Sequence, residues 1–259
     1  MIFTASQQPV FKQVKENYEC IHDVLESTKD SDWLLTPEGS LSGYCEGPVH
    51  NCTQETKDEY NDYVLKLENY LKENRRNLAL GTGHIEQDKL PYNEIRFYKE
   101  GNFQRYYAKQ LLTHGPDFMG EYHFYVPGVK LETYDLAPNV RAGALICNDA
   151  WAYPLASPNG NPYYWRTLRE MGCSIVFVSA NCTMDVRDEV VYNFHESMLR
   201  IMAKSYNMHV VVSSASTDMN GVVVQHTQAP SGIISDTGEW IAKCKEQGMD
   251  TVSAEIDFG

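Results

Sequence analysis

The chain has 259 residues, of which 42% are hydrophobic and 12% aromatic, and this composition is sufficient for a sizeable folded core. Its formal net charge of −13 disfavours nucleic acid and anionic membrane surfaces as partners, because like charges repel. No segment approaches the ~20 apolar residues of a membrane span.

The beginning of the sequence lacks the basic region and the long apolar stretch of a secretory signal, so we expect a cytoplasmic protein. The seven cysteines are scattered and odd in number, and they show neither a paired framework nor metal-ligand spacing. We therefore expect reduced thiols, no bound metal and no cofactor.

Short apolar runs alternate with longer amphipathic stretches, a pattern typical of α/β layering. Apolar residues that recur every three or four positions predict the helices, and short apolar runs predict the strands. In chain order we expect a strand at Ile2–Ser6, a helix within Val10–Thr28, a strand at Trp33–Thr36, a helix at Thr56–Asn74, strands at Leu78–Gly81, Asn93–Tyr98, Gln104–Ala108 and Val140–Ile146, a helix at Pro162–Met171, a strand at Ser174–Ser179, a helix at Val190–Tyr206, and strands at His209–Ser214, Gly232–Ser235 and Thr251–Asp257.

Four good helices are too few to cover both faces of one sheet that contains so many strands. Two sheets stacked face to face, each with one helical layer outside, use these elements better. The sequence shows no internal repeat and no Pro/Gly-rich linker that would divide it. We therefore predict a single α/β domain over residues 1–259, built from two stacked sheets flanked by helices.

Three reactive side chains follow predicted strands, at the sheet edge where α/β proteins place their sites. Glu38 comes after Trp33–Thr36, Lys109 directly after Gln104–Ala108, and Cys147 directly after Val140–Ile146. Taken singly, each has an ordinary explanation, since strand-end acids and lysines are usually solvated and a cysteine in an apolar run is usually core.

Together, a glutamate, a lysine and a cysteine form a chemically complete set. A free thiol and a free glutamate differ by about four pKa units, so proton transfer between them costs roughly 6 kcal/mol. Burial of the glutamate and a nearby ammonium both narrow that gap. The ammonium and the backbone N–H of Asn148 can then hold an oxyanion. No histidine is needed, although His114 and His195 remain alternatives for the base.

These residues resemble the motifs of the nitrilase superfamily, the carbon–nitrogen hydrolases, and the similarity covers nearly the whole chain. Pro37-Glu38-Gly39, Tyr107-Ala-Lys109 and Ile146-Cys147-Asn-Asp149 are similar to its glutamate, lysine and cysteine motifs. The resemblance implies a four-layer αββα sandwich that dimerises through a helical face. It also implies that Glu121 is the family's extra glutamate, which orients the lysine and the substrate.

Departures from the family pattern bear on the substrate. Enzymes that cleave nitriles commonly carry tryptophan and glutamate after the nucleophile, whereas Asn148 and Asp149 stand here. Cys147-Asn-Asp is similar to the start of the motif of N-carbamoyl-D-amino acid hydrolases, but their carboxylate-binding arginines are replaced by Ala150-Trp-Ala152. We therefore predict cleavage of a small amide, with N-carbamoyl hydrolysis as the alternative and nitrile hydrolysis third.

Four further residues are predicted to line the pocket, namely Tyr44, Asn148, Trp151 and Asn181. The expected partners are a small-molecule amide or carbamoyl substrate and further copies of the chain, in a homodimer or higher homo-oligomer. A catalytically silent binding or scaffold protein is the rival from another class. A thiol redox protein is disfavoured because Cys147 has no neighbouring cysteine in the sequence.

Overall fold

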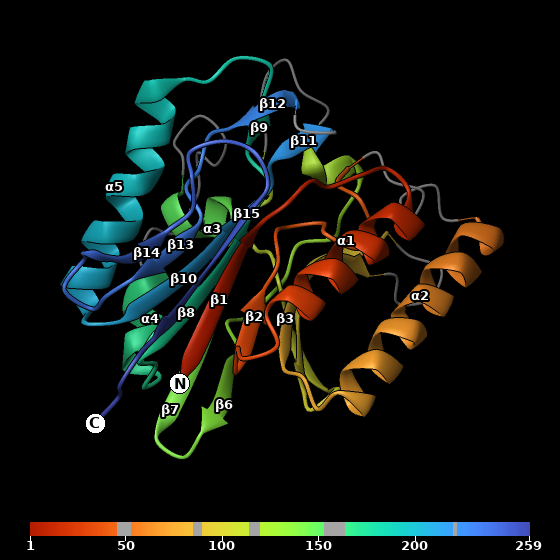
Figure 1. The fold of residues 1–259 in the computed structure, drawn as a ribbon. Coiled ribbons are helices and arrows are strands. Elements are labelled where there is room, and N and C mark those ends of the chain that lie inside the picture. The colour runs from red at the N-terminus through yellow and green to blue at the C-terminus, as the bar shows by residue number, and fades with distance from the viewer. Residues whose placement is uncertain (46–52, 85–89, 114–119, 153–163, 220–221) are drawn as a thin grey trace.

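The computed structural model describes residues 1–45, 53–84, 90–113, 120–152, 164–219 and 222–259. Two six-stranded sheets lie face to face, and helices cover their outer faces (Figure 1). The first residue and Ile256 lie together, since the amino group of Met1 donates a 2.9 Å hydrogen bond to the Ile256 carbonyl. The two stacked sheets and their outer helices confirm the predicted αββα sandwich.

The first sheet has the strand order β15-β1-β2-β3-β4-β5. The β1–β2 and β2–β3 pairs are parallel, whereas β15–β1, β3–β4 and β4–β5 are antiparallel. Its strands are β1 (Ile2–Gln7), β2 (Trp33–Leu35), β3 (Leu78–His84), β4 (Tyr92–Lys99), β5 (Asn102–Ala108) and β15 (Asp250–Glu255).

The second sheet has the order β14-β13-β10-β8-β7-β6, with a parallel centre formed by β7, β8 and β10. Its strands are β6 (Thr133–Ala137), β7 (Val140–Ile146), β8 (Ile175–Ala180), β10 (His209–Ser214), β13 (Gly232–Ile234) and β14 (Trp240–Lys243). A small third sheet joins β9 (Thr183–Met184), β12 (Val222–Thr227) and β11 (Thr217–Met219).

The inner faces of the two large sheets share one core. Phe177 of β8 lies 5.6–6.2 Å, between ring centroids, from Phe3, Trp33 and Phe97 of the first sheet. Apolar side chains of β1, β7 and β10 complete this layer. Strands β7, β8 and β10 are buried on both faces, which explains why most of their residues are apolar.

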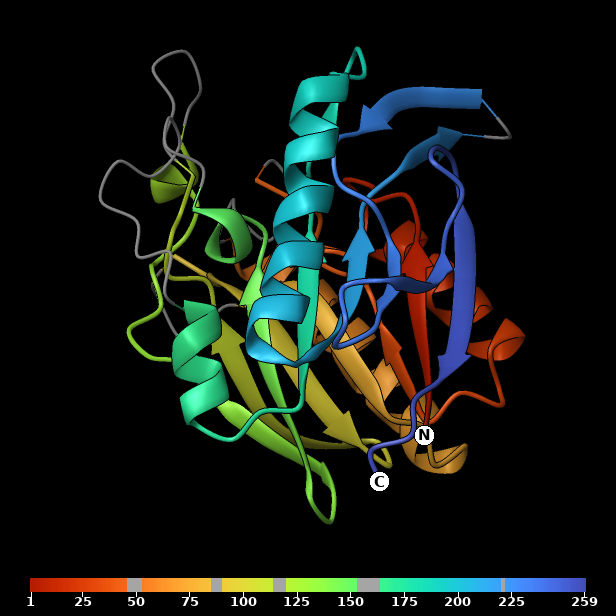
Figure 2. The same cartoon turned by 90° about the vertical axis from the view of Figure 1, so that its left-hand side faces the viewer.

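Helices α1 (Val14–Ser27) and α2 (Gln54–Glu73) cover the first sheet, and α4 (Tyr164–Glu170) and α5 (Glu189–Tyr206) cover the second (Figures 1 and 2). The first pair packs through one apolar stripe on each helix, as their spacing predicts. A short helix α3 (Asn148–Trp151) and a 3₁₀ turn η2 (Glu121–His123) were not predicted. Among the described residues, no helix is long and apolar enough to cross a membrane.

Candidate active site

The glutamate loop is built by a tight turn after β2. Gly39 has φ +75°, and the Ser40 N–H and hydroxyl both donate to the carbonyl of Gly81 on β3, at 2.7 and 2.8 Å. A side chain at Gly81 would place its Cβ 2.2 Å from the Pro37 carbonyl oxygen. Glycine is therefore required there, because only it lets β3 approach the loop that carries Glu38.

Lys109 directly follows β5 and is held at both backbone groups. Its N–H donates to Asn93 O at 2.8 Å, and its carbonyl accepts from Gly128 N at 2.7 Å. The side chain is fully buried, and its Nζ donates to Glu38 Oε1 and to Glu121 Oε1, each at 2.8 Å. The structure thus brings three of the four predicted catalytic residues into direct contact.

The two carboxylates have further donors. Glu38 Oε1 accepts from Asn93 Nδ2 at 2.6 Å, and its Oε2 accepts from the backbone N–H of Asn181 at 2.7 Å. Glu121 Oε1 accepts from the Tyr44 hydroxyl at 3.0 Å, and its Oε2 accepts from Thr113 N at 2.5 Å. Both carboxylates are fully buried and so cannot draw these hydrogen bonds from bulk water.

Cys147 stands at the turn between β7 and α3 in a conformation that a non-glycine residue rarely adopts, with φ +48°. Its N–H donates to Ser179 O of β8 at 2.7 Å. The Ser179 hydroxyl in turn donates to Thr36 O at 2.7 Å, so the cysteine turn is tied to the strand that precedes Glu38. Cys147 is 5% exposed. The charge of Lys109 lowers the pKa of its thiol, and the charge of Glu38 raises it.

Asp149, two residues after Cys147, connects this turn to the lysine segment. Its Oδ2 accepts from the Tyr107 hydroxyl at 2.8 Å and from Ile146 N at 3.2 Å. Its Oδ1 accepts from the backbone N–H groups of Gln110 and Leu111, at 3.2 and 2.7 Å. Burial raises the pKa of Asp149 to about 6. This carboxylate therefore holds two backbone segments and the Tyr107 hydroxyl in place.

The surroundings of the two glutamates shift their pKa values in opposite directions. Burial raises the pKa of Glu38 to about 7, although the charge of Lys109 lowers it. Burial also opposes ionisation of Glu121, but the charge of Lys109 and hydrogen bonds from Lys109 and Thr113 outweigh it and lower the pKa of Glu121. A pair of carboxyls with opposite shifts is the arrangement expected for one fixed counter-ion and one exchangeable base.

The protonation of the lysine and the thiol follows from the same surroundings. Burial disfavours the ammonium of Lys109, but the negative charges around it raise its pKa well above the usual value. A hydrogen bond with Cys182 and burial raise the pKa of Cys147 well above the usual value, against the lowering effect of Lys109. The resting site therefore holds an ammonium and a neutral thiol.

The predicted pocket residues have different environments. Tyr44 contacts Glu121, and Asn181 supports Glu38 through its backbone N–H and through Nδ2, which donates to Glu38 O at 3.3 Å. The Asn148 Nδ2 donates to Leu111 O at 3.3 Å. Trp151 belongs to the core. The contacts of these residues with a substrate stay predictions.

Of the two alternative bases, only His195 lies within the described residues. His195 packs against Trp151 with ring centroids 4.1 Å apart, and its Nδ1 is 2.7 Å from Gln228 O. Burial lowers the pKa of His195 to about 4. His114 lies outside the described residues. Within the parts of the chain that the structure describes, no three His, Cys, Asp or Glu residues are grouped to hold a metal ion.

The sequence did not indicate that Asn93 and Cys182 belong to the site. Asn93 bridges the two carboxylates, since its Nδ2 also lies 3.3 Å from Glu121 Oε1. Cys182 Sγ lies 3.3 Å from Cys147 Sγ. Each cysteine follows one of the adjacent parallel strands β7 and β8, and this common position is a signal that could have paired them.

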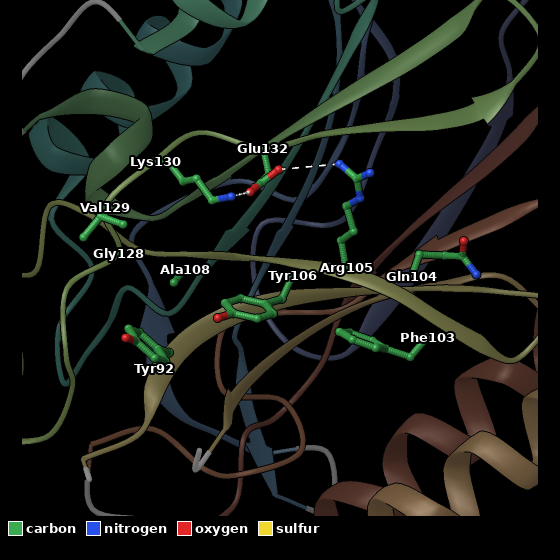
Figure 3. A pocket seen from close by; sticks show the side chains of 10 residues that line it. All are labelled: Tyr92, Phe103, Gln104, Arg105, Tyr106, Ala108, Gly128, Val129, Lys130 and Glu132. Carbon is green, nitrogen blue, oxygen red and sulfur yellow. Dashed lines mark ion pairs between the residues drawn. The ribbon is translucent and has the colours of Figure 1, made fainter. Parts of the chain in front are cut away.

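A groove of about 410 Å³ lies beside β5. Figure 3 shows the side chains that line it. Its wall carries Glu132, which pairs with Lys130 and, at 3.8 Å, with Arg105. Tyr92, Phe103 and Tyr106 form its aromatic part. None of the four predicted catalytic residues lines it, so this groove is separate from the candidate site.

A family model described as Carbon-nitrogen hydrolase matches residues 3–259. The chain belongs to the carbon–nitrogen hydrolase family. This result confirms the resemblance inferred from the glutamate, lysine and cysteine motifs. A comparison with curated proteins found no match.

Among solved structures, this carbon–nitrogen hydrolase is similar in fold to the NitN amidase from Nesterenkonia sp. AN1. The TM-score is 0.78 at 17% identity, covering 100% of this chain and 93% of the other. A second structure of that amidase, a glutamine-for-glutamate variant with acrylamide added to its active-site cysteine, gives a TM-score of 0.78 at 17% identity and covers 99% and 93%. A third, titled as an amidase from Nesterenkonia sp., gives 0.77 at 18% and covers 98% and 90%.

Proposed function

We propose that this carbon–nitrogen hydrolase is an amidase that cleaves a small, non-peptide amide through a thioester on Cys147. The observation that carries the proposal is the fully buried ammonium of Lys109, held at 2.8 Å by Glu38 and at 2.8 Å by Glu121. A buried charge is costly unless it is paired, and this one is placed where its charge reaches the Cys147 thiol. A binding scaffold has no need for such a site.

In the proposed reaction, Glu38 accepts the thiol proton as the Cys147 sulfur attacks the amide carbonyl. Lys109 and the backbone N–H of Asn148 stabilise the oxyanion. Glu38 then gives the proton to the leaving ammonia or amine. The same carboxylate activates a water molecule that hydrolyses the thioester, and Glu121 keeps Lys109 oriented throughout.

The choice of an amide over a nitrile rests on the residues after the nucleophile, Asn148 and Asp149. Asp149 is committed to backbone groups and Tyr107, so it cannot serve as a polar contact for substrate. N-carbamoyl hydrolysis, which releases carbon dioxide as well as ammonia, is the alternative within this chemistry. A homo-oligomeric assembly and a cytoplasmic location stay predictions.

The test is a panel of small amides, N-carbamoyl compounds and nitriles assayed for ammonia and carbon dioxide, with intact-mass detection of the acyl-enzyme. We expect ammonia from amides without carbon dioxide, and an adduct on Cys147. Cys147→Ala should reduce the rate to background and remove the adduct. Cys173→Ala, which also truncates a buried thiol, serves as the matched control and should keep both.

Two results would contradict the proposal. Equal ammonia release by wild type and Cys147→Ala would show that the nucleophile is misassigned. If wild type turns over no member of the panel and forms no adduct on Cys147, the alternative of a catalytically silent binding or scaffold protein replaces the proposed amidase.

A further inference from the structure

The nucleophile proposed above does not stand alone, because a second thiol faces it. Cys147 Sγ and Cys182 Sγ are 3.3 Å apart, although 35 residues separate them in the sequence. No cysteine neighbours Cys147 in the sequence, but β7 and β8 are adjacent parallel strands and bring both cysteines to one sheet edge.

Both cysteines are anchored through their backbones. The Cys147 N–H donates to Ser179 O at 2.7 Å, and the Cys182 carbonyl accepts from Gln228 N at 2.6 Å. A disulfide has an S–S length of about 2.05 Å, so the two sulfurs need to approach by little more than ~1 Å. Side-chain rotation can supply such a movement while these backbone hydrogen bonds stay in place.

The two thiols differ in their access to solvent. Cys147 is 5% exposed, whereas Cys182 is only half-buried. A small oxidant from solution therefore reaches Cys182 more readily. The residue beside Cys182, Asn181, donates its N–H at 2.7 Å to Glu38, the carboxylate that we assign as the base for Cys147.

We propose that Cys147 and Cys182 form a reversible disulfide when the protein meets a hydroperoxide, and that this bond switches the active site off. The Cys182 thiol first takes an oxygen atom from the hydroperoxide, which leaves as an alcohol or as water, and becomes a sulfenic acid. Cys147, whose proton passes to Glu38, attacks that sulfur. The S–S bond forms, the S–O bond breaks, and the hydroxide leaves as water with the proton from Glu38.

In total, the two thiols lose two electrons and one hydroperoxide gains them. A thiol reductant reverses the reaction by exchange and restores both cysteines. The disulfide also protects the nucleophile, because a sulfur in a disulfide is shielded from the irreversible sulfinic and sulfonic stages. The loss of activity rests on the proposed function, whereas formation of the bond does not.

The experiment treats the full chain with about one equivalent of hydrogen peroxide, then maps peptides under non-reducing conditions and measures amide hydrolysis before and after dithiothreitol. In wild type we expect a peptide cross-linked between Cys147 and Cys182, loss of most activity, and its recovery on reduction. Each protein is compared with its own reduced activity. In Cys182→Ser we expect no cross-linked peptide and a several-fold smaller loss of activity.

Cys20→Ser is the matched control, because Cys20 has the same half-buried exposure but lies on α1. It should behave as wild type in both measurements. Absence of the cross-linked peptide from oxidised wild type overturns the proposal, whether or not the protein hydrolyses amides. A loss of activity in Cys182→Ser that equals that of wild type and is recovered to the same extent by dithiothreitol overturns it as well.

Discussion

At the scale of single residues, the decisive feature is one buried ammonium shared by two buried carboxylates. With all three ionised, Lys109, Glu38 and Glu121 carry a net negative charge in a place closed to water. Such a charge is expensive, so one carboxyl is poised to take up a proton. The opposite pKa shifts assign that proton to Glu38, and Glu121 stays the permanent counter-ion of the lysine.

This assignment predicts the pH dependence of the reaction. The pKa of Glu38 is raised to about 7, so below that pH the carboxyl is protonated and cannot accept the proton of Cys147. We expect kcat/KM to fall about tenfold per pH unit below about pH 7 and to level off above it. Glu38→Gln should lower kcat/KM by ~10²–10⁴ and abolish this fall at low pH, the acidic limb of the pH profile.

A second variant fixes the identity of the titrating group. The negative charge of Glu121 helps to raise the pKa of Glu38, so Glu121→Gln should move the limb to lower pH. Glu132→Gln makes the same change in the groove beside β5 and should leave the limb in place. A limb that survives in Glu38→Gln, or that Glu121→Gln moves upward, would show that another group is the base.

At the scale of secondary-structure elements, the site depends on how three strand ends are connected. The turn after β7 carries the nucleophile, the segment after β5 carries the ammonium, and Asp149 bonds to both. Ser179 and Thr36 provide the corresponding connection between β8 and the glutamate loop. The catalytic side chains are thus positioned by buried polar groups that belong to the elements.

Asp149→Asn tests this connection. With its amide oxygen in the place of Oδ1, the asparagine can still accept both backbone hydrogen bonds there. Its NH₂ then meets the Ile146 N–H in place of an acceptor oxygen, and the Tyr107 hydroxyl must turn from donor to acceptor. We expect a loss of ~1–3 kcal/mol in the free energy of unfolding in urea, because buried donors lose their partner. A fall in kcat beyond the loss of folded protein should accompany it.

Tyr107→Phe is the control, since it removes one of the four hydrogen bonds to Asp149 and leaves the backbone bonds intact. It should cost about 1 kcal/mol and little of kcat. If Asp149→Asn retains the wild-type kcat, Asp149 has no part in positioning the nucleophile and the lysine.

In the second sheet, the success of sequence reasoning followed how strongly each strand is buried. The central strands, for example β8 and β10, are apolar on both faces, and their runs were recognised within a residue or two. The edge strands β6 and β14 were missed because one face is solvated and the pattern is diluted by polar residues. In the third sheet, β9 and β11 have only two and three residues, too few for periodicity to identify them. The six-residue strand β12 was missed as well.

The candidate site could be predicted where its residues follow recognisable strands, and not elsewhere. Glu38, Lys109 and Cys147 each follow a recognisable strand, so the sheet edge where they meet could be inferred from topology. Asn93 lies inside β4, where an asparagine gives no chemical signal, and Cys182 lies beyond the strand end by two residues. Their roles emerge only from distances between segments that are far apart in the sequence.

At the scale of the whole molecule, the two sheets depend on one another. The layer between them is a single core, in which Phe177 of the second sheet contacts three aromatic residues of the first. Buried hydrogen bonds also cross between the sheets, from Ser179 to Thr36 and from Ser213 to the Ser6 carbonyl. Neither sheet can bury its inner face alone, so we expect the two to fold as a single domain.

We therefore expect one cooperative unfolding transition, even in a variant that damages only one sheet. Phe177→Ala removes a fully buried ring and should cost ~3–5 kcal/mol. Its effect should reach the first sheet, so the urea transitions followed by far-UV circular dichroism and by tryptophan fluorescence should shift together. Phe103→Ala removes a ring that is 41% exposed on the edge strand β5 and should shift the midpoint far less. Two separate transitions in Phe177→Ala would show instead that each sheet with its helices is stable by itself, and the catalytic groups, which come from both, would then lose their alignment before either half unfolds.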